Sequence, residues 1–166
     1  MGGVPYYWGF LKKGLSLSQN IDSILFEKDA PLRDEFKYLY ASVFKKPENY
    51  VKIIEALGTK KVGMTREEII TATKIPNSGD LTTKLEELES CGFIRKYNAF
   101  GMKKKNAIYQ LMDCFTLFYF KFLKSEPTDE HFWTNQINTP AVNTWLGLAF
   151  ERVCMEHVDQ IKFKLG

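Results

Sequence analysis

The chain has 166 residues, a formal net charge of +3 and an apolar content of 45%. This length allows one sizeable hydrophobic core or two small ones, and so weak a positive charge does not by itself indicate nucleic-acid binding. Three cysteines cannot all pair, which argues against a disulfide framework and favours a reducing compartment. Because no apolar run reaches transmembrane length and the opening residues lack a signal-peptide pattern, we expect a cytoplasmic protein without a membrane partner.

Residues 1–46 carry short apolar stretches at helical spacing, which predict a small all-helical unit. Pro5 and Pro31 suit the first turns of two of its helices, because proline fits the first helical position. Gly14 is expected to end the first helix and Ser18 to cap the second. Since a unit of this size would seldom be stable alone, it should pack against another part of the protein.

The stretch 47–112 opens with two more predicted helices. An apolar stripe over residues 50–57 indicates the first of them. Thr65 and Glu68 have the spacing of a capping box, in which each side chain satisfies the backbone N–H of the other residue. The second helix therefore starts at Thr65, and it breaks at the run 76–79, which contains Pro, Asn, Ser and Gly.

A third helix and a hairpin complete this stretch. Ser78 is a good cap for the helix, Gly92 a good stop, and its apolar stripe consists of Leu81, Leu85 and Leu88. Residues 93–97 and 107–111 read as two strands around a basic turn. Three helices followed by a hairpin is the order of a winged helix-turn-helix. The predicted fold class is thus mostly α with a small β-hairpin wing.

The stretch 113–166 is predicted as C-terminal helices. Asp113 is a plausible cap for an aromatic helix that runs to residue 123, and residues 125–140 look like a loop with at most one helical turn. A last helix is expected over residues 141–158. Residues 161–165 alternate apolar and basic side chains, which is typical of a strand.

The hairpin is the clearest charge feature. Its positive charges, with no acid among them, are Arg95, Lys96, Lys103, Lys104 and Lys105. Such a wing can neutralise the phosphates of duplex DNA and give salt-sensitive binding without sequence preference. The same lysines equally suit a solvated hairpin tip that discourages edge-to-edge strand pairing.

The third helix argues against base reading. Between residues 80 and 90 a single lysine stands against four carboxylates, and carboxylates are repelled by phosphate. Its candidate DNA contacts are Thr82, Thr83 and Lys84. A winged helix used for packing or for docking a partner is therefore the preferred interpretation.

No catalytic or metal site can be assembled from the sequence. Cys154 and His157 lie one helical turn apart without a second pair of ligands, so we regard their spacing as coincidence. Cys91 and Cys114 are expected to be small apolar fillers at helix ends. Glu151 is a lone acid, whereas a metal-dependent nuclease needs several converging carboxylates. The chain also has no phosphate-binding P-loop motif.

Taken together, these features resemble a family of prokaryotic AAA/STAND-like P-loop ATPases over essentially the whole chain. The order of the motifs, more than any single one, carries the resemblance. They are Gly2-Gly3-Val4-Pro5-Tyr6-Tyr7, Ala30-Pro31-Leu32 with Glu35-Phe36, the Tyr50, Ile54 and Leu57 helix, the Thr82, Leu85, Leu88 and Gly92-Phe93-Ile94 segment, Tyr109-Gln110-Leu111 with Asp113 and Phe115, and Gly147 with Phe150-Glu151 and Cys154.

The resemblance implies a helical lid at 1–46, a winged helix at 47–112 and the start of a restriction-endonuclease-like domain at 113–166. ATP and Mg²⁺ would belong to an upstream ATPase domain, and Glu151 matches the first acidic motif of the nuclease-like domain. We therefore expect a non-catalytic portion of a longer ATPase, with no cofactor of its own and with the neighbouring ATPase and nuclease-like domains as partners. The alternative is a free-standing winged-helix transcriptional regulator that binds DNA through the basic wing. Apolar surface in the last segment also permits a homo-oligomer.

Overall fold

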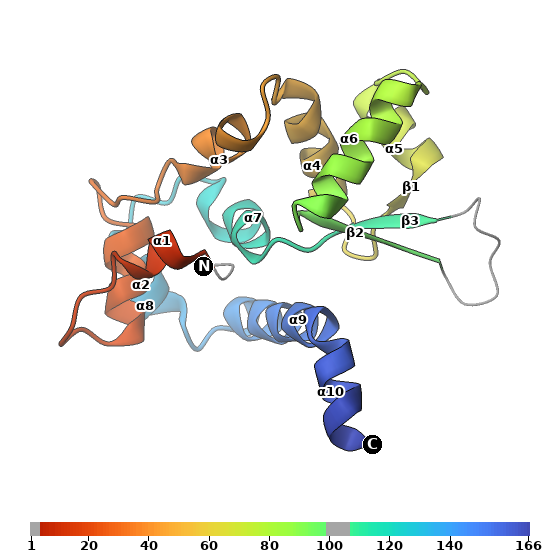
Figure 1. Cartoon of the computed structure of the whole chain (residues 1–166). Coiled ribbons are helices and arrows are strands. Elements are labelled where there is room, and N and C mark those ends of the chain that lie inside the picture. The colour runs from red at the N-terminus through yellow and green to blue at the C-terminus, as the bar shows by residue number, and fades with distance from the viewer. Residues whose placement is uncertain (1–3, 99–106) are drawn as a thin grey trace. The chain divides into compact units, whose positions relative to one another are not determined.

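The computed structural model describes residues 4–98 and 107–166 (Figure 1). It comprises two compact units, each described here by itself. The central unit is Asp34–Phe120, and the terminal unit combines Met1–Arg33 with Lys121–Gly166. The described residues are mostly helical with one small antiparallel sheet, which confirms the predicted fold class. The predicted boundaries at residues 46 and 112 concern domains of a parent protein and stay a prediction.

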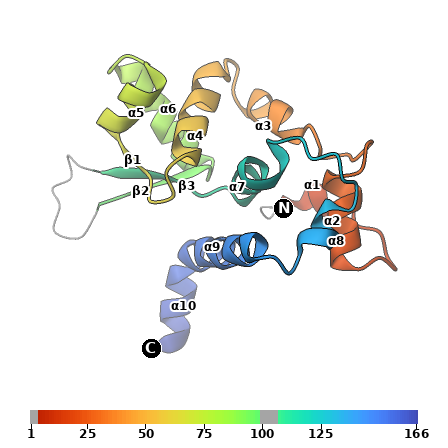
Figure 2. The same cartoon turned by 180° about the vertical axis from the view of Figure 1, so that it is seen from behind.

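The central unit contains the expected three helices and hairpin. In chain order its elements are α3 (Glu35–Val43), α4 (Glu48–Gly58), β1 (Met64–Thr65), α5 (Arg66–Thr73), α6 (Gly79–Ser90), β2 (Ile94–Tyr97), β3 (Ile108–Leu111) and α7 (Cys114–Phe118). The strand order is β1-β3-β2, and Arg95 pairs with Gln110 across the hairpin. Helices α4, α5 and α6 lie on one side of this sheet (Figures 1 and 2). From α4 to β3 this is the connectivity of a winged helix-turn-helix.

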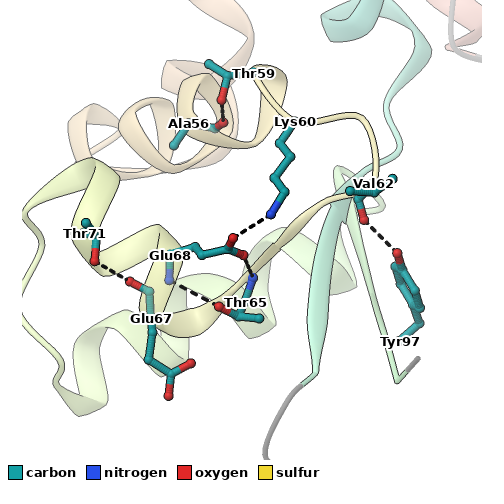
Figure 3. A network of polar contacts seen from close by, with 9 residues as sticks. All are labelled: Ala56, Thr59, Lys60, Val62, Thr65, Glu67, Glu68, Thr71 and Tyr97. Carbon is teal, nitrogen blue, oxygen red and sulfur yellow. Dashed lines mark hydrogen bonds and ion pairs between the residues drawn. The ribbon is translucent and has the colours of Figure 1, made fainter. Parts of the chain in front are cut away.

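Local capping explains where these helices begin and end. The Thr65 hydroxyl accepts from the Glu68 N–H at 3.3 Å, and Glu68 accepts from the Thr65 N–H at 2.8 Å, so the predicted capping box is confirmed (Figure 3). Ser78 caps α6 as predicted, accepting from the Leu81 N–H. Strand β1 was not expected from the sequence, because two residues are too few for an alternating pattern.

The predicted apolar stripes form the core of the winged helix. Ile53, Ile54 and Leu57 of α4 are buried, as are the α6 leucines Leu81, Leu85 and Leu88. Cys91 was predicted to be a small apolar filler, and this is wrong because its residue is exposed. At 100° per residue Cys91 lies well to the side of the leucine stripe, where α6 has already ended.

Aromatic side chains join α3 and α7 within the central unit. The rings of Phe36 and Tyr119 stack with their centroids 3.9 Å apart, and the buried Tyr40 hydroxyl lies 2.9 Å from the Thr116 hydroxyl. Burial raises the pKa of the Tyr40 phenol well above its usual range. Asp113 caps α7 as predicted, accepting from the Thr116 N–H at 2.7 Å. The helix then continues as a π-helical turn, Tyr119–Leu123.

The terminal unit consists of helices in the described residues. They are α1 (Pro5–Trp8), α2 (Leu17–Leu25), α8 (Phe132–Gln136), α9 (Pro140–Glu156) and α10 (Val158–Leu165). Phe122, Trp133 and Trp145 pack edge to face with centroids 5.4 to 6.1 Å apart. This ring cluster and the fully buried Val142 hold the start of α9 in the core of the unit. No helix among the described residues is both long and apolar enough to cross a bilayer.

The buried Asp22 ties α2 to α8 in this unit. Its carboxylate accepts from the Trp133 N–H at 2.7 Å, from the Thr134 N–H at 3.1 Å and from the Thr134 hydroxyl at 2.5 Å. Asp22 thus acts as a cap for the first turn of α8, supplied by a helix that lies far away in the sequence.

Three local predictions of where helices begin or end, all outside the winged helix, are wrong. Ser16, not Ser18, caps α2, because Gln19 completes a capping box with Ser16. The first helix ends at Trp8 with Gly9 as its cap, well before Gly14. Helix α3 begins at Glu35 instead of near Pro31, since residues 31–34 form turns.

The predicted strand at residues 161–165 is also wrong, because the segment belongs to α10. Val158, Ile161 and Leu165 are spaced like one face of a helix, and this 3.6-residue period outweighs the short alternation. Apolar runs of this length fit both periods, which explains the error.

Candidate functional site

The predicted DNA-contact residues that the structure describes lie on α6 and β2, which pack against each other. Thr82 and Thr83 are exposed on α6, and their hydroxyls donate to carbonyl groups one turn earlier in the chain, those of Ser78 and Gly79. The predicted contacts Lys103, Lys104 and Lys105 lie outside the described residues. Five of the eight predicted positions can therefore be placed.

Lys84, the lysine of α6, is withdrawn from the surface. Only 13% of its side chain is exposed, its ammonium lies 2.5 Å from the Asp80 carboxylate, and it sits 5.2 Å from the centre of the Tyr50 ring. An ammonium held by a carboxylate and an aromatic face must give up both contacts before it can reach a phosphate. Lys84 therefore stabilises the packing of α6 on α4.

A hydrogen bond from Tyr50 to Glu87 completes this polar cluster, and the phenol is the donor. Burial of the phenol and its bond to the carboxylate raise the pKa of Tyr50 to about 12. The cluster of Tyr50, Asp80, Lys84 and Glu87 thus engages two of the four carboxylates of α6, of which Glu87 is half-buried and Asp80 is 61% exposed.

The cations of β2 are also engaged. The Arg95 Nε donates to the Gln110 side chain at 2.7 Å, and the guanidinium lies 4.8 Å from the centre of the Tyr97 ring. The Lys96 N–H donates to the Glu89 carboxylate at 3.1 Å, whereas its ammonium, on an exposed residue, lies 5.8 Å from the centre of the Tyr109 ring. Of these two cations, Lys96 is the one better placed to meet a phosphate.

The loop before β1 is fixed to the wing and to α5 by polar contacts (Figure 3). The Tyr97 hydroxyl donates to the Val62 carbonyl at 2.7 Å, and the Lys60 ammonium lies 2.5 Å from the Glu68 carboxylate. That contact with Lys60 and the bond from the Thr65 N–H lower the pKa of Glu68. Since both charged side chains are more than 40% exposed, the ion pair adds little stability.

The outward face of α6 is left polar and acidic. It carries the hydroxyls of Thr82, Thr83 and Ser90 and the exposed carboxylates of Glu86 and Glu89. A major-groove helix presents donors to the bases and cations to the flanking phosphates, and this face offers neither guanidinium nor ammonium. Its chemistry suits a partner that supplies hydrogen-bond donors or positive charge.

The sequence identified Lys84 as a candidate DNA contact but did not reveal its contacts with Asp80 and Tyr50. The spacing of Asp80 and Lys84, four residues apart on a helix, is a signal that could have revealed their ion pair. The contact of Tyr50 with Glu87 depends on how α4 packs against α6, which no local pattern contains. Likewise, the register that places Arg95 opposite Gln110 cannot be read across a long hairpin loop.

Elsewhere the candidate residues are not gathered into a site. Glu151 is exposed on α9, and Cys154 lies half-buried on the same helix. Among the described residues no three His, Cys, Asp or Glu side chains come together as ligands of a metal ion. The winged helix therefore remains the candidate functional surface.

Comparisons of the chain with models of protein families, with curated protein sequences and with solved structures gave no match.

The Tyr50 phenol offers a direct check on the cluster. Because its pKa is raised above the usual value of about 10, the neutral phenol stabilises the fold below pH 10, and this contribution should disappear as the pH rises towards about 12. We expect Tyr50→Phe to remove one late-ionising phenol from an ultraviolet absorbance titration. Tyr38→Phe, at an exposed tyrosine, controls for the loss of one ring hydroxyl. If the two variants gave the same titration curve at high pH, the raised pKa of the Tyr50 phenol would be contradicted.

Proposed function

We propose that this chain is a non-catalytic portion of a longer AAA/STAND-like ATPase and that its winged helix docks on a protein surface. The single observation that carries the docking role is the state of Lys84, which is paired with Asp80 and covered by Tyr50. The ATPase assignment is supported by the order of motifs in the sequence. In that role ATP and Mg²⁺ would bind the parent protein's nucleotide domain.

Electrostatics supports protein docking over base reading. A helix entering the major groove brings its outer face within a few ångströms of two phosphate backbones, where Glu86 and Glu89 would be repelled. The Thr82 and Thr83 hydroxyls remain available to a partner that donates hydrogen bonds. A protein surface with lysine, arginine or backbone N–H groups supplies such donors.

The second candidate function is sequence-independent contact with duplex DNA through the wing. It is supported by Lys96, an exposed cation on the strand that leads towards Lys103, Lys104 and Lys105. Such binding would depend on counterion release and would weaken steeply with salt.

Fluorescence anisotropy with a labelled DNA duplex separates the two candidates. If the winged helix is a protein-docking module, the dissociation constant at near-physiological salt should be weaker than about 10⁻⁴ M, the upper end for non-specific binding. Lys84→Ala should leave any low-salt binding unchanged, because Lys84 is withdrawn.

The matched pair of variants for this titration reverses three charges each. One is Lys103→Glu, Lys104→Glu, Lys105→Glu; the control is Lys45→Glu, Lys46→Glu, Lys52→Glu at exposed positions of the central unit. Binding tighter than about 10⁻⁴ M at near-physiological salt that only the first triple abolishes would overturn protein docking in favour of DNA contact. The ATPase assignment has its own test: the reading frame that encodes this chain should carry a P-loop motif upstream, and a frame without one refutes it.

A further inference from the structure

The apolar side of helix α9 is buried at the start of the helix and exposed further along. Val142 is fully buried and Trp145 belongs to the ring cluster. Further along the same side of the helix Leu146, Phe150 and Val153 follow at intervals of four and three residues, and all three are exposed, Phe150 to 70%. This is the spacing by which an amphipathic helix presents anchors to a partner.

Helix α10 presents a second stripe of the same length. None of its residues is buried. Val158, Ile161 and Leu165 follow at intervals of three and four residues, and Leu165 is 83% exposed. Two exposed stripes on consecutive helices form a larger apolar surface than the scattered single side chains that are normal on a monomer.

The balance of exposed charge differs between the two helices: α9 is acidic, whereas the one acid of α10, Asp159 in its first turn, stands against two lysines in its last turn. The exposed charged residues of α9 are Glu151 and Glu156, since Arg152 is buried. The last turn of α10 carries Lys162 and Lys164. An α10 helix is therefore complementary to an α9 helix both in apolar spacing and in charge.

We propose that two copies of this chain associate by reciprocal exchange, with α10 of each copy lying on the exposed stripe of α9 of the other. The arrangement is isologous, because the same pair of contacts forms twice around a two-fold axis. Phe150 and Leu165 are the main apolar anchors. Lys162 and Lys164 of one copy face Glu151 and Glu156 of the other, which selects this pairing over α9 on α9 or α10 on α10.

The size of the two stripes sets the strength of the dimer. Six side chains per copy are fewer than the roughly 20 to 30 residues per side of a standard interface, so the contact should bury less than about 1,200 Å² in total, the range of weak and transient interfaces. We therefore expect a dissociation constant on the order of micromolar. Sedimentation velocity over roughly this concentration range should show a reversible monomer–dimer equilibrium of the full chain.

Apolar variants test the stripes. Phe150→Glu and Leu165→Glu are each expected to weaken the dimer more than tenfold, because a carboxylate would be buried in an apolar contact. Both positions are exposed in the single copy, so far-ultraviolet circular dichroism should not change. Tyr38→Glu is the control at an exposed aromatic position of the central unit, and it should leave the dimer intact. A wild-type chain that stays monomeric throughout, or equal weakening by Tyr38→Glu, overturns the proposal.

Charge exchange tests the pairing itself. The double variants Glu151→Lys, Glu156→Lys and Lys162→Glu, Lys164→Glu should each weaken self-association about tenfold, since each brings like charges together. An equimolar mixture of the two should form a heterodimer as tight as the wild-type dimer, because both contacts then regain opposite charges. Failure of the mixture to restore association overturns the exchange, even if the wild-type chain dimerises by another surface.

Discussion

Asp22→Ala should lower the free energy of unfolding of the terminal unit by about 3 kcal/mol or more. Its residue is 2% exposed, and its carboxylate accepts three hydrogen bonds from Trp133 and Thr134. The substitution leaves two backbone N–H groups at the start of α8 without their acceptor and opens space for a carboxylate. Donors deprived of a charged acceptor in the protein interior carry a large desolvation cost.

Tryptophan fluorescence during urea unfolding measures this effect in the right part of the molecule. All three tryptophans, Trp8, Trp133 and Trp145, belong to the terminal unit. Asp29→Ala is the matched control at an exposed aspartate, and its effect should stay within about 0.5 kcal/mol. Asp22→Asn keeps the shape of the side chain and one acceptor oxygen, so its loss of unfolding free energy should lie between those of Asp22→Ala and Asp29→Ala. Equal midpoints for Asp22→Ala and Asp29→Ala would contradict the role given to Asp22.

The second large effect is expected at Gly63, in the loop before β1. Its φ is +87°, a conformation that side chains disfavour, and an added Cβ would lie 2.4 Å from the Tyr109 carbonyl oxygen on β3. The obstacle is backbone in the centre of the sheet, so it cannot be relieved by a rotamer change. We expect Gly63→Ala to destabilise the central unit by about 3 kcal/mol, the sum of backbone strain and displaced strand packing.

Substitutions at two other glycines distinguish the cost of backbone strain from the cost of a steric clash. Gly92 also has a positive φ, of +77°, but its Cβ would meet nothing within 4 Å, so Gly92→Ala should cost only about 1 kcal/mol. Gly79 starts α6 with neither feature, and Gly79→Ala should be neutral or slightly stabilising. Far-ultraviolet circular dichroism during unfolding ranks the three. A Gly63→Ala loss no greater than that of Gly92→Ala would show that β3 yields to the added methyl group.

These two sites illustrate what could be predicted from the sequence. The capping box of Thr65 and Glu68, the Ser78 cap and the Asp113 cap were predicted correctly, because each depends on residues three positions apart. The hydrogen bond that Asp22 accepts from the Thr134 N–H joins residues 112 positions apart, and no local sequence pattern predicts it. For the same reason the winged helix was predicted more closely than the terminal unit, whose packing joins both ends of the chain.

On the candidate surface, too, the local features could be predicted from the sequence and the long-range contacts could not. Sequence counting identified the acidic character of α6 but not how two of its carboxylates are used, since Asp80 pairs with Lys84 and Glu87 accepts from the Tyr50 phenol. Which charged side chains of α6 stay free of such contacts depends on how α4 packs on α6. A formal charge count therefore misses that the α6 lysine is withdrawn into this cluster, with 13% of its side chain exposed.

The Glu89 carboxylate has a further consequence for how the hairpin meets other molecules. Strand β2 is one of the two edge strands of the sheet, and its Lys96 N–H donates to that carboxylate. A foreign chain that tried to extend the sheet there would have to displace an ionised group and would find an acceptor where it needs a donor. The Glu89 carboxylate of α6 thus occupies one backbone donor of this edge strand and disfavours intermolecular strand pairing at that position.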